Sequence, residues 1–491
     1  MDLARAEIGK IYLTGNLRRN RRLMTARLTS TVCSICFIIA FGPFISTAWA
    51  AQPNVLFIAV DDLNDWVGHL GGHPNAKTPN IDRLAKRGVS FTAAYCSAPL
   101  CNPSRISLLT GIAPSNSGVY GNGEKLREKL PDAVTLMQHF RKAGYTARGS
   151  GKIFHGAKPY DPESWDEFHV PPWGGKRKTL HDETLPESAW TPWGPGAQSD
   201  EEMFDHKIAS WVISELDRSH EKPFFLACGF TKPHLPWIVP QSYFDRHPLD
   251  GIELPETIDG DLDDVPAFGR KLAREVYDVS GGKNFEQHGG DHQNVIANNQ
   301  WHLAVQAYLA TISFVDDQVG RVLDALDQSE YADNTIIVLW GDHGWHLGEK
   351  EHWRKHALWD VTTRTPLIIS APEKVAKNAR CDRPVSLIDL YPTLIDLCEL
   401  PERNELDGQS LAPLLANPAK EWNRPVVMTY GYKNHAIQTE RWRYIQYHDG
   451  TNELYDHDND PNEWTNLANK PEYDTVIREL KASLPTTNSK P

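Results

Sequence analysis

The 491-residue sequence has few cysteines, a deficit of positive charge and no tract of low complexity. It contains 7 cysteines, and its 51 Lys and Arg residues against 64 Asp and Glu residues give a net charge of −13. An acidic chain is a poor partner for nucleic acid or an anionic membrane, because phosphate groups attract Lys and Arg. The 40% share of hydrophobic residues excludes a disordered or fibrous chain. The length favours one large domain with a smaller one.

The apolar segment near the start, residues 35–45, follows a cluster of arginines. It is shorter than the ~20 residues that a helix needs to span a bilayer, which argues against the alternative of a membrane anchor. Ala48 and Ala50 fit the A-x-A pattern of a signal-peptidase site. We therefore predict a signal peptide over residues 1–50, with translation starting at Met24, and an exported protein, periplasmic or secreted, without a stable membrane anchor. Cleavage would leave a net charge of −18.

An odd number of cysteines follows the predicted cleavage site. They are Cys96, Cys101, Cys228, Cys381 and Cys398. Cysteines in an oxidising compartment normally pair into disulfides. An odd count therefore indicates that one of them serves another purpose. The sequence leaves the pairing of the other four open.

Several continuous apolar, β-branched runs are typical of buried parallel strands. They lie at residues 54–60, 223–230, 335–343 and 366–371. Helical patterns lie between them, most clearly at residues 301–328, where apolar residues recur every three or four positions. Strands that alternate with helices predict an α/β fold with a mostly parallel central sheet flanked by helices.

The pattern changes after about residue 415. Short alternating segments such as "VVMTYGY" and "WRYIQYHD" are separated by turn residues. Such segments are typical of a small antiparallel sheet. We therefore predict a main domain over residues 51–414 and a C-terminal subdomain with an antiparallel sheet over residues 415–491.

Two of the predicted strands end in residues that can bind a metal ion. Asp61 and Asp62 follow the first strand, and Asp342 and His343 follow the third. Hard divalent cations prefer several carboxylate oxygens that converge from separate elements. A helix cap or a surface turn would explain one acidic pair alone. Two such pairs on one sheet favour a metal site at the carboxyl ends of the strands.

The segment "CNPSRISLLTG", residues 101–111, combines Cys-x-Pro-Ser-Arg with Leu-Leu-Thr-Gly. This pattern is the signal by which a cysteine is oxidised to formylglycine, an aldehyde, in the sulfatase family. A buried cysteine before a helix capped by Ser104 is the alternative for the motif alone. The sequence resembles the sulfatase family along nearly its whole length after the signal peptide. The motifs that follow the family's order are "NVLFIAVDDL", "TPNIDRLAKRG", "CNPSRISLLTG", "GKIFHG", "TKPHLPW", "GDHGWHLGE" and "ELYDHDNDPNEWTNLA".

The motifs "GKIFH", "KPHLPW" and "DHGWHLGE" look most like the iduronate-2-sulfatase branch. The resemblance implies an alkaline-phosphatase-like fold and hydrolysis of a sulfate ester in a sulfated glycan, most closely a 2-O-sulfated uronate. It also implies that a formylglycine-generating enzyme modifies Cys101. A hydrated aldehyde has two hydroxyl groups, so one can attack sulfur and the other can expel sulfate as the carbonyl re-forms. The implied ligands of one calcium ion are Asp61, Asp62, Cys101 in its modified form, Asp342 and His343.

The resemblance assigns roles to further residues. Arg105, one helical turn after residue 101, would hydrogen-bond the diol or the sulfate. Lys152 and His155 match family positions that bind sulfate and take the diol proton. His234 matches the residue that protonates the leaving alcohol, a task that suits histidine near neutral pH. The remaining candidates for substrate binding are Lys232, Trp345 and Lys355.

Some positions depart from the family pattern and leave the glycan open. His343 stands where many sulfatases carry Asn or Gln, and His356 follows Lys355 where the human iduronate-2-sulfatase has an aromatic hydroxyl. Residues 171–200 match no family motif. The alternatives are a sulfatase of another polysaccharide and a phosphate mono- or diesterase of the same superfamily, which would carry Ser or Thr in place of Cys101. A catalytically silent glycan-binding protein would lack a metal ligand.

Overall fold

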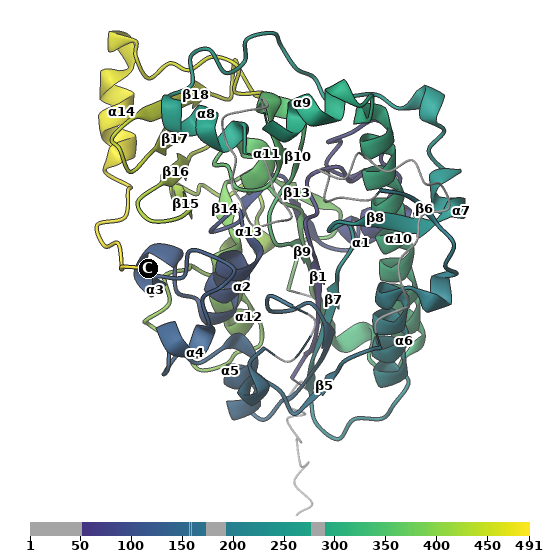
Figure 1. The fold of residues 1–491 in the computed structure, drawn as a ribbon. Coiled ribbons are helices and arrows are strands. Elements are labelled where there is room, and N and C mark those ends of the chain that lie inside the picture. Colours follow the sequence, from purple (N-terminus) through teal and green to yellow (C-terminus); the bar gives the residue numbers. More distant parts are fainter. Residues whose placement is uncertain (1–51, 157, 159, 173–192, 276–289, 373) are drawn as a thin grey trace, which may run out of the picture. The chain divides into compact units, whose positions relative to one another are not determined.

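A computed structural model describes most of the chain after residue 51 (Figure 1). The described residues are 52–156, 158, 160–172, 193–275, 290–372 and 374–491. The predicted signal peptide lies outside them. So does most of the segment that matched no family motif, residues 173–192. Within the described ranges, every helix is too short or too polar to cross a membrane.

A mostly parallel sheet forms the centre of the described chain (Figure 1). Its strands, in the order in which they pair, are β13 (Ala379–Cys381), β2 (Val89–Phe91), β12 (Leu367–Ser370), β9 (Thr335–Gly341), β1 (Asn54–Val60), β7 (Phe224–Phe230), β4 (Thr146–Gly151) and β5 (Glu167–His169). The pairs from β9 to β5 are all parallel. The predicted mostly parallel sheet is therefore confirmed.

Helices cover both faces of this sheet (Figure 1). One face packs against α1 (Pro79–Ala85), α6 (Phe204–Leu216) and α10 (Trp301–Gln328), and the other against α2 (Cys101–Thr110), α5 (Leu136–Lys142) and α12 (Leu390–Leu397). Alternate residues of β1 enter the two cores, so that Ile58 belongs to one and Phe57 to the other. Burial on both faces explains why β1 is a continuous apolar run. Helix α10 coincides with the predicted helix over residues 301–328.

Strand β12 runs antiparallel to both of its neighbours, β9 and β2. We expected residues 366–371 to be a parallel strand like the others, and this expectation is wrong in direction. Two parallel strands need a connection that crosses back to the opposite edge of the sheet. Residues 342–366 do not cross back. They form short elements at the edge where β9 ends, so the chain re-enters the sheet from that edge.

Shorter elements fill the connections between the main ones. Three strand pairs are β3 (Ala94–Tyr95) with β14 (Val385–Ser386), β6 (Trp193–Gly196) with β8 (Trp237–Pro240), and β10 (His346–Leu347) with β11 (Trp353–Arg354), among the described residues. The short helices include α3 (Pro114–Ser117), α4 (Leu126–Lys129), α7 (Gln241–Phe244), α8 (Ala267–Ala273), α9 (Gly290–Ala297), α11 (Asp360–Thr363) and α13 (Ala412–Ala416).

An antiparallel sheet follows near the C-terminus, as predicted. Its strands are β15 (Val426–Thr429), β16 (His435–Gln438), β17 (Trp442–Gln446) and β18 (Asn452–Asp456). The helix α14 (Asp474–Lys481) packs on this sheet through Ile477 and Leu480. The subdomain boundary at residue 415 stays a prediction.

Arg443 of β17 connects the C-terminal sheet to the segment that follows β11. Its side chain is 0% exposed. The guanidinium lies 2.9 Å from Asp360 Oδ1 and 2.8 Å from Glu463 Oε1, and it donates hydrogen bonds to Leu358 O and Thr363 Oγ1. The neighbouring Arg364 and Arg443 charges outweigh burial and hold the pKa of Asp360 well below its usual range. Buried charges of this kind are stable only when they are paired.

We expect Arg443→Met to lower the free energy of unfolding by about 3–5 kcal/mol, because it removes the buried cation that Asp360 and Glu463 share. Arg441→Met is the matched control, since Arg441 is 47% exposed where it pairs with Asp456. A surface ion pair contributes only about 0–1 kcal/mol. Urea denaturation followed by tryptophan fluorescence measures both losses. Equal losses for the two variants would contradict the structural role of Arg443.

Candidate active site

The candidate active site lies where neighbouring parallel strands end at one edge of the central sheet. Strands β9, β1, β7 and β4 are adjacent, and they are followed by Asp342, Asp61, Thr231 and Lys152, respectively. Backbone hydrogen bonds continue the pairing past the strands, because Asp61 N donates to β7 and Asp342 N donates to β1, each at 3.3 Å. Ligand sites of open α/β sheets lie outside these carboxyl ends.

Two glycines allow the ends of β4 and β7 to approach closely. Gly151 has a φ of +82°, a conformation that side-chain-bearing residues rarely adopt. A Cβ atom on Gly229 would lie 2.4–2.5 Å from backbone atoms of Lys152. Lys152 N donates a hydrogen bond of 2.8 Å to Gly229 O. Because Gly151 and Gly229 have no side chains, the two strands can approach closely, and this close approach sets the position of the Lys152 backbone at the site.

Asp62 adopts an unusual backbone conformation, with a φ of +59°. Its N–H donates to Asp342 Oδ1 at 2.9 Å, and its carbonyl accepts a hydrogen bond of 2.8 Å from the hydroxyl of Tyr308 on α10. The same hydroxyl accepts a hydrogen bond from Asn64 N at 3.0 Å. Tyr308 thus fixes the turn that carries the first two aspartates.

Arg105 of α2 holds two strand ends together. Its Nε donates to Asp342 Oδ2 at 2.8 Å and its Nη2 donates to Asp61 Oδ1 at 3.0 Å. Its Nη1 donates to the carbonyls of Lys152 and Ile153. The guanidinium is fully buried and planar, so these bonds set the spacing between the carboxylates. The resemblance implied contact with the diol or sulfate, and that role stays a prediction.

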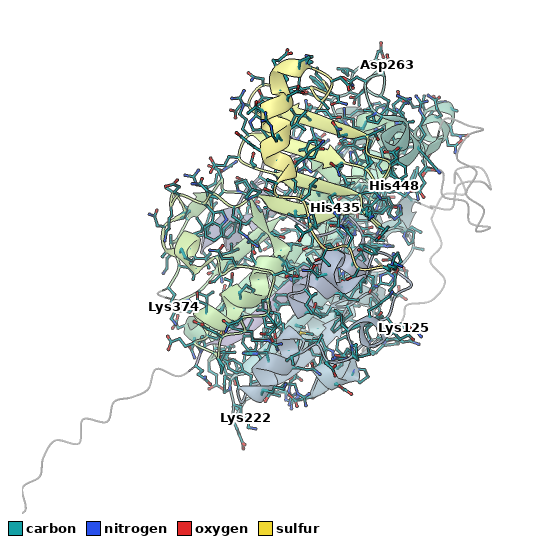
Figure 2. All side chains as sticks on the ribbon, turned by 90° about the vertical axis from the view of Figure 1, so that its left-hand side faces the viewer. Lys125, Lys222, Asp263, Lys374, His435 and His448 are labelled. Carbon is teal, nitrogen blue, oxygen red and sulfur yellow. The ribbon has the colours of Figure 1, made fainter. Side chains whose placement is uncertain are left out.

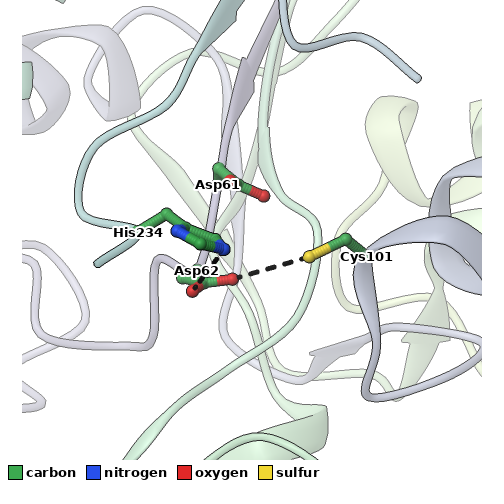
Figure 3. A group of neighbouring side chains, drawn as sticks. All are labelled: Asp61, Asp62, Cys101 and His234. Carbon is green, nitrogen blue, oxygen red and sulfur yellow. Dashed lines mark hydrogen bonds and ion pairs between the residues drawn. The ribbon is translucent and has the colours of Figure 1, made fainter. Parts of the chain in front are cut away.

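Cys101 lies at the N-terminus of α2, fully buried and surrounded by charged groups (Figure 3). Its Sγ is 3.0 Å from Lys355 Nζ, 3.4 Å from His343 Nε2, 3.6 Å from Lys152 Nζ and 3.8 Å from Asp62 Oδ1. Burial alone would raise the pKa of the thiol, but Lys152 and Lys355 lower it well below its usual value. This environment stabilises negative charge at residue 101.

His234 stands beside Asp62, and the Asp62 carboxylate lies between His234 and Cys101 (Figure 3). Its Nε2 is 3.8 Å from Asp62 Oδ2, and its Nδ1 lies 2.6 Å from Leu235 O. A carbonyl only accepts hydrogen bonds, so Nδ1 carries a proton and Nε2 faces the cluster. The side chain is 37% exposed, whereas Asp62 is fully buried. His234 therefore lies where the cluster meets solvent.

The charges of the buried cluster nearly balance. Its carboxylates are Asp61, Asp62 and Asp342, and its permanent cations are Arg105, Lys152 and Lys355. Burial raises the pKa of Asp61, but the positive charges around it, Lys152 first among them, together outweigh burial and hold that pKa well below 3.8. Burial raises the pKa of Asp342 to about 7 against the opposing charge of Arg105. Asp342 and Cys101 together outweigh the effect of burial on His343 and raise the pKa of its imidazole to about 9.

The donor set fits a hard divalent cation. Ligand atoms of Asp62, Cys101, Asp342 and His343 lie within 4.8 Å of one another, and Asp61 belongs to an overlapping group. Asp62 Oδ2 is buried and has no hydrogen-bond partner among the described residues. A buried carboxylate oxygen without a partner is costly, and a cation would satisfy it. These residues therefore fit the metal site predicted from the sequence.

Of the other predicted site residues, Lys355 and Trp345 lie at the cluster, whereas His155 makes no bond to it among the described residues. Lys355 reaches the cluster, with Nζ 2.7 Å from Asp62 Oδ1, and it lies 5.3 Å from the ring centroid of Trp345. Trp345 itself is only 2% exposed, so its ring packs behind Lys355. For His155 the described residues show no bond to the cluster, and its Nδ1 is buried without a hydrogen-bond partner there. The substrate-binding and catalytic roles of these residues stay predictions.

Two positioning residues carry no signal that sequence reasoning could use. Tyr308 lies within the predicted helix over residues 301–328, where an aromatic residue is typical of a buried face. Asp205, which accepts hydrogen bonds from the backbone N–H groups of Thr231 and Lys232, lies near the start of α6, where an acidic residue is common for any helix. Their roles become visible only in the structure, where Tyr308 bonds the carbonyl of Asp62 and Asp205 bonds the start of the segment after β7.

Comparisons with known proteins agree with the geometry. The family model described as "Sulfatase" matches residues 53–400. A second model, "N-sulphoglucosamine sulphohydrolase, C-terminal", matches residues 348–490. Together they cover nearly all of the described chain.

Individual proteins are similar to this chain over most of its length as well. A protein named "Sulfatase" from Formosa agariphila is 41% identical over 462 residues, which is 89% of this chain and 87% of the relative. Human iduronate 2-sulfatase is 31% identical over 383 residues, 74% of this chain and 67% of the relative. The solved phosphonate monoester hydrolase of Silicibacter pomeroyi matches with a TM-score of 0.72 at 24% identity, over 88% of this chain and 94% of that one. The predicted alkaline-phosphatase-like fold is confirmed.

Proposed function

The chain belongs to the sulfatase family, and we propose that it removes sulfate from a sulfated carbohydrate, specifically from a 2-O-sulfated uronate. The observation that carries this proposal is the setting of Cys101, which lies between two lysine ammonium groups at the end of the central strands. The uronate specificity rests on the 31% identity with human iduronate 2-sulfatase.

The cluster is suited to hold an anion next to residue 101. A sulfate group bound there would lie within reach of both Lys152 Nζ and Lys355 Nζ, which are 3.6 and 3.0 Å from Cys101 Sγ. Charged hydrogen bonds of this kind are strong in a buried site. They also overcome the repulsion of an acidic chain for an anionic substrate.

We infer that a formylglycine-generating enzyme converts Cys101 to formylglycine before the site closes. The Cys-x-Pro-Ser-Arg motif supports this modification, and the five cysteines of the described residues are all free of disulfides. Hydrated formylglycine supplies a hydroxyl nucleophile and a second hydroxyl group for the release of sulfate. The surrounding residues bind the sulfate and hold this position away from bulk water.

We infer that the cation is one Ca²⁺ ion held by Asp61, Asp62, residue 101, Asp342 and His343. Bound there, calcium supplies positive charge that lowers the pKa of a hydroxyl nucleophile and neutralises a sulfate oxygen. Carboxylate oxygens predominate among these ligands, as calcium requires.

His234 is placed to protonate the leaving sugar oxygen. Its Nε2 faces the cluster while the side chain still reaches solvent, where the sugar must lie. Proton donation to a poor leaving group is the usual task of a histidine in such a position. His155 remains a candidate to take the proton from residue 101.

The function is tested by measuring inorganic sulfate released from a panel of sulfated disaccharides. We expect the highest kcat/KM for a 2-O-sulfated uronate, and a lower value for 6-O- and N-sulfated sugars and for the matching phosphate esters. Cys101→Ala should abolish release, because it removes the residue that is modified. A preference for phosphate esters would contradict the proposal and favour a phosphoesterase.

Peptide mass spectrometry of the same preparation checks residue 101. The aldehyde or its hydrate is expected in active protein. An active preparation that carries only the free thiol there would rule out formylglycine.

We expect one Ca²⁺ per chain in purified protein and none in Asp342→Ala, because that variant removes one of the carboxylates of the ligand set. Elemental analysis by mass spectrometry counts the ion, and chelation should abolish turnover. Asp327→Ala is the matched control, since this aspartate pairs with Arg87 away from the strand ends. Full activity of metal-free protein would contradict the assignment.

We expect His234→Ala to lower kcat for a sugar sulfate by ~10²–10⁴, the usual contribution of general acid catalysis. An activated aryl sulfate should lose much less, because its phenolate leaves without protonation. His448→Ala is the matched control, because His448 is an exposed histidine of the C-terminal sheet region (Figure 2). The measurement is kcat of the wild type and of each variant on both esters. Equal losses would mean that His234 binds sulfate or shapes the pocket.

A further inference from the structure

The segment between β7 and β8, residues 231–236, carries His234 and is anchored at its start by Asp205 of α6. Asp205 is buried, and its Oδ1 accepts hydrogen bonds from Thr231 N at 2.9 Å and from Thr231 Oγ1 at 2.7 Å. Its Oδ2 accepts a hydrogen bond of 2.8 Å from Lys232 N. The carboxylate thus ties the first two residues of the segment to the helix that packs behind them.

The side chain of Lys232 anchors the other end of the segment. It is 2% exposed, and Nζ donates to His234 O at 3.1 Å and also to Pro236 O. Trp237 Nε1 adds a hydrogen bond of 2.7 Å to Pro233 O. An ammonium group withdrawn from water must find acceptors, so these carbonyls are held close to Nζ.

The bonds of Lys232 bracket the atom that orients the imidazole. His234 Nδ1 donates to Leu235 O, and this carbonyl lies between the two carbonyls that Lys232 binds. A shift of the segment therefore turns the ring and moves Nε2 away from Asp62. In contrast, Lys152 and Lys355 extend their ammonium groups directly to Cys101 Sγ.

We propose that Lys232 is a positioning residue for His234, supported by Asp205, and that it does not bind the sulfate group. This assignment replaces the substrate-binding role that the sequence suggested for Lys232. It rests on the proposed function, in which His234 protonates the leaving sugar oxygen. Lys232 acts on that step through the segment whose carbonyl groups it holds.

The test compares Lys232→Met with the wild type on a sugar sulfate and on an activated aryl sulfate. We expect kcat for the sugar sulfate to fall about 10- to 100-fold, part of the ~10²–10⁴ that a general acid contributes. KM, inhibition by inorganic sulfate and kcat for the aryl sulfate should stay unchanged. Asp205→Asn should show the same bias toward the sugar ester. Lys222→Met is the control for loss of a lysine, because Lys222 is exposed at the far end of the molecule from the C-terminal sheet (Figure 2).

Equal losses on both esters, together with weaker inhibition by inorganic sulfate, would overturn the proposal and make Lys232 a sulfate ligand. Should Lys232→Met fail to fold, Lys232→Arg gives the same comparison, because it keeps the charge but changes the geometry. A crystal structure of the variant provides a readout that does not depend on activity. We expect His234 Nε2 to be displaced from Asp62, and an unmoved imidazole would overturn the proposal.

The two hypotheses fail in different ways. If the wild type hydrolyses neither ester, the proposed function is wrong, and the position of the imidazole in the variant still decides the role of Lys232. If the wild type hydrolyses both esters and His234→Ala shows no leaving-group bias, the acid assignment fails. In that case a displaced imidazole supports only the positioning of His234 by Lys232.

Discussion

Burial of opposite charges at one edge of the sheet is the constraint on which the rest of the site depends. Water cannot solvate Asp61, Asp342 or Arg105, so each must find its partner within the protein. The partners come from different strands and from α2, and they meet only if the strands are in register. Val60 pairs with both Phe230 and Gly341, which places the residues after β1, β7 and β9 side by side. A slip of one residue would separate every charge pair.

Much of this arrangement could be predicted because it leaves local patterns in the sequence. Strand β1 is buried at every position and apolar from Val55 to Val60, since both of its faces are covered, and acidic residues appear as soon as it ends. The modification motif and the long helix α10 are likewise continuous in sequence. Other features depend on partners that no local pattern specifies. Tyr308 resembles any buried helix residue until its hydroxyl is seen on the carbonyl of Asp62.

Lysines show the limit of sequence reasoning most clearly. The resemblance to the family led us to expect that Lys152, Lys232 and Lys355 would all bind the sulfate or the rest of the substrate. The structure directs two of the ammonium groups toward Cys101 and the third toward backbone carbonyls. Residue type and position in a motif cannot separate these cases, because the direction of a long side chain is set by the acceptors around it. The direction of β12 was missed for a related reason, since the path of residues 342–366 is a tertiary property.

The deep burial of Cys101 also limits the time during which another protein can reach its thiol. Strand β9, whose end supplies Asp342 and His343, finishes roughly 240 residues after Cys101 along the chain. At the usual ~5–20 residues per second, a ribosome needs roughly 10–50 s to make that stretch. During this interval the thiol is still accessible, because β9 and His343, which contacts the thiol, have not yet been made. Another protein that acts on Cys101 must therefore work on the growing or unfolded chain. In a chain that folds first, Cys101 is buried and stays a free thiol.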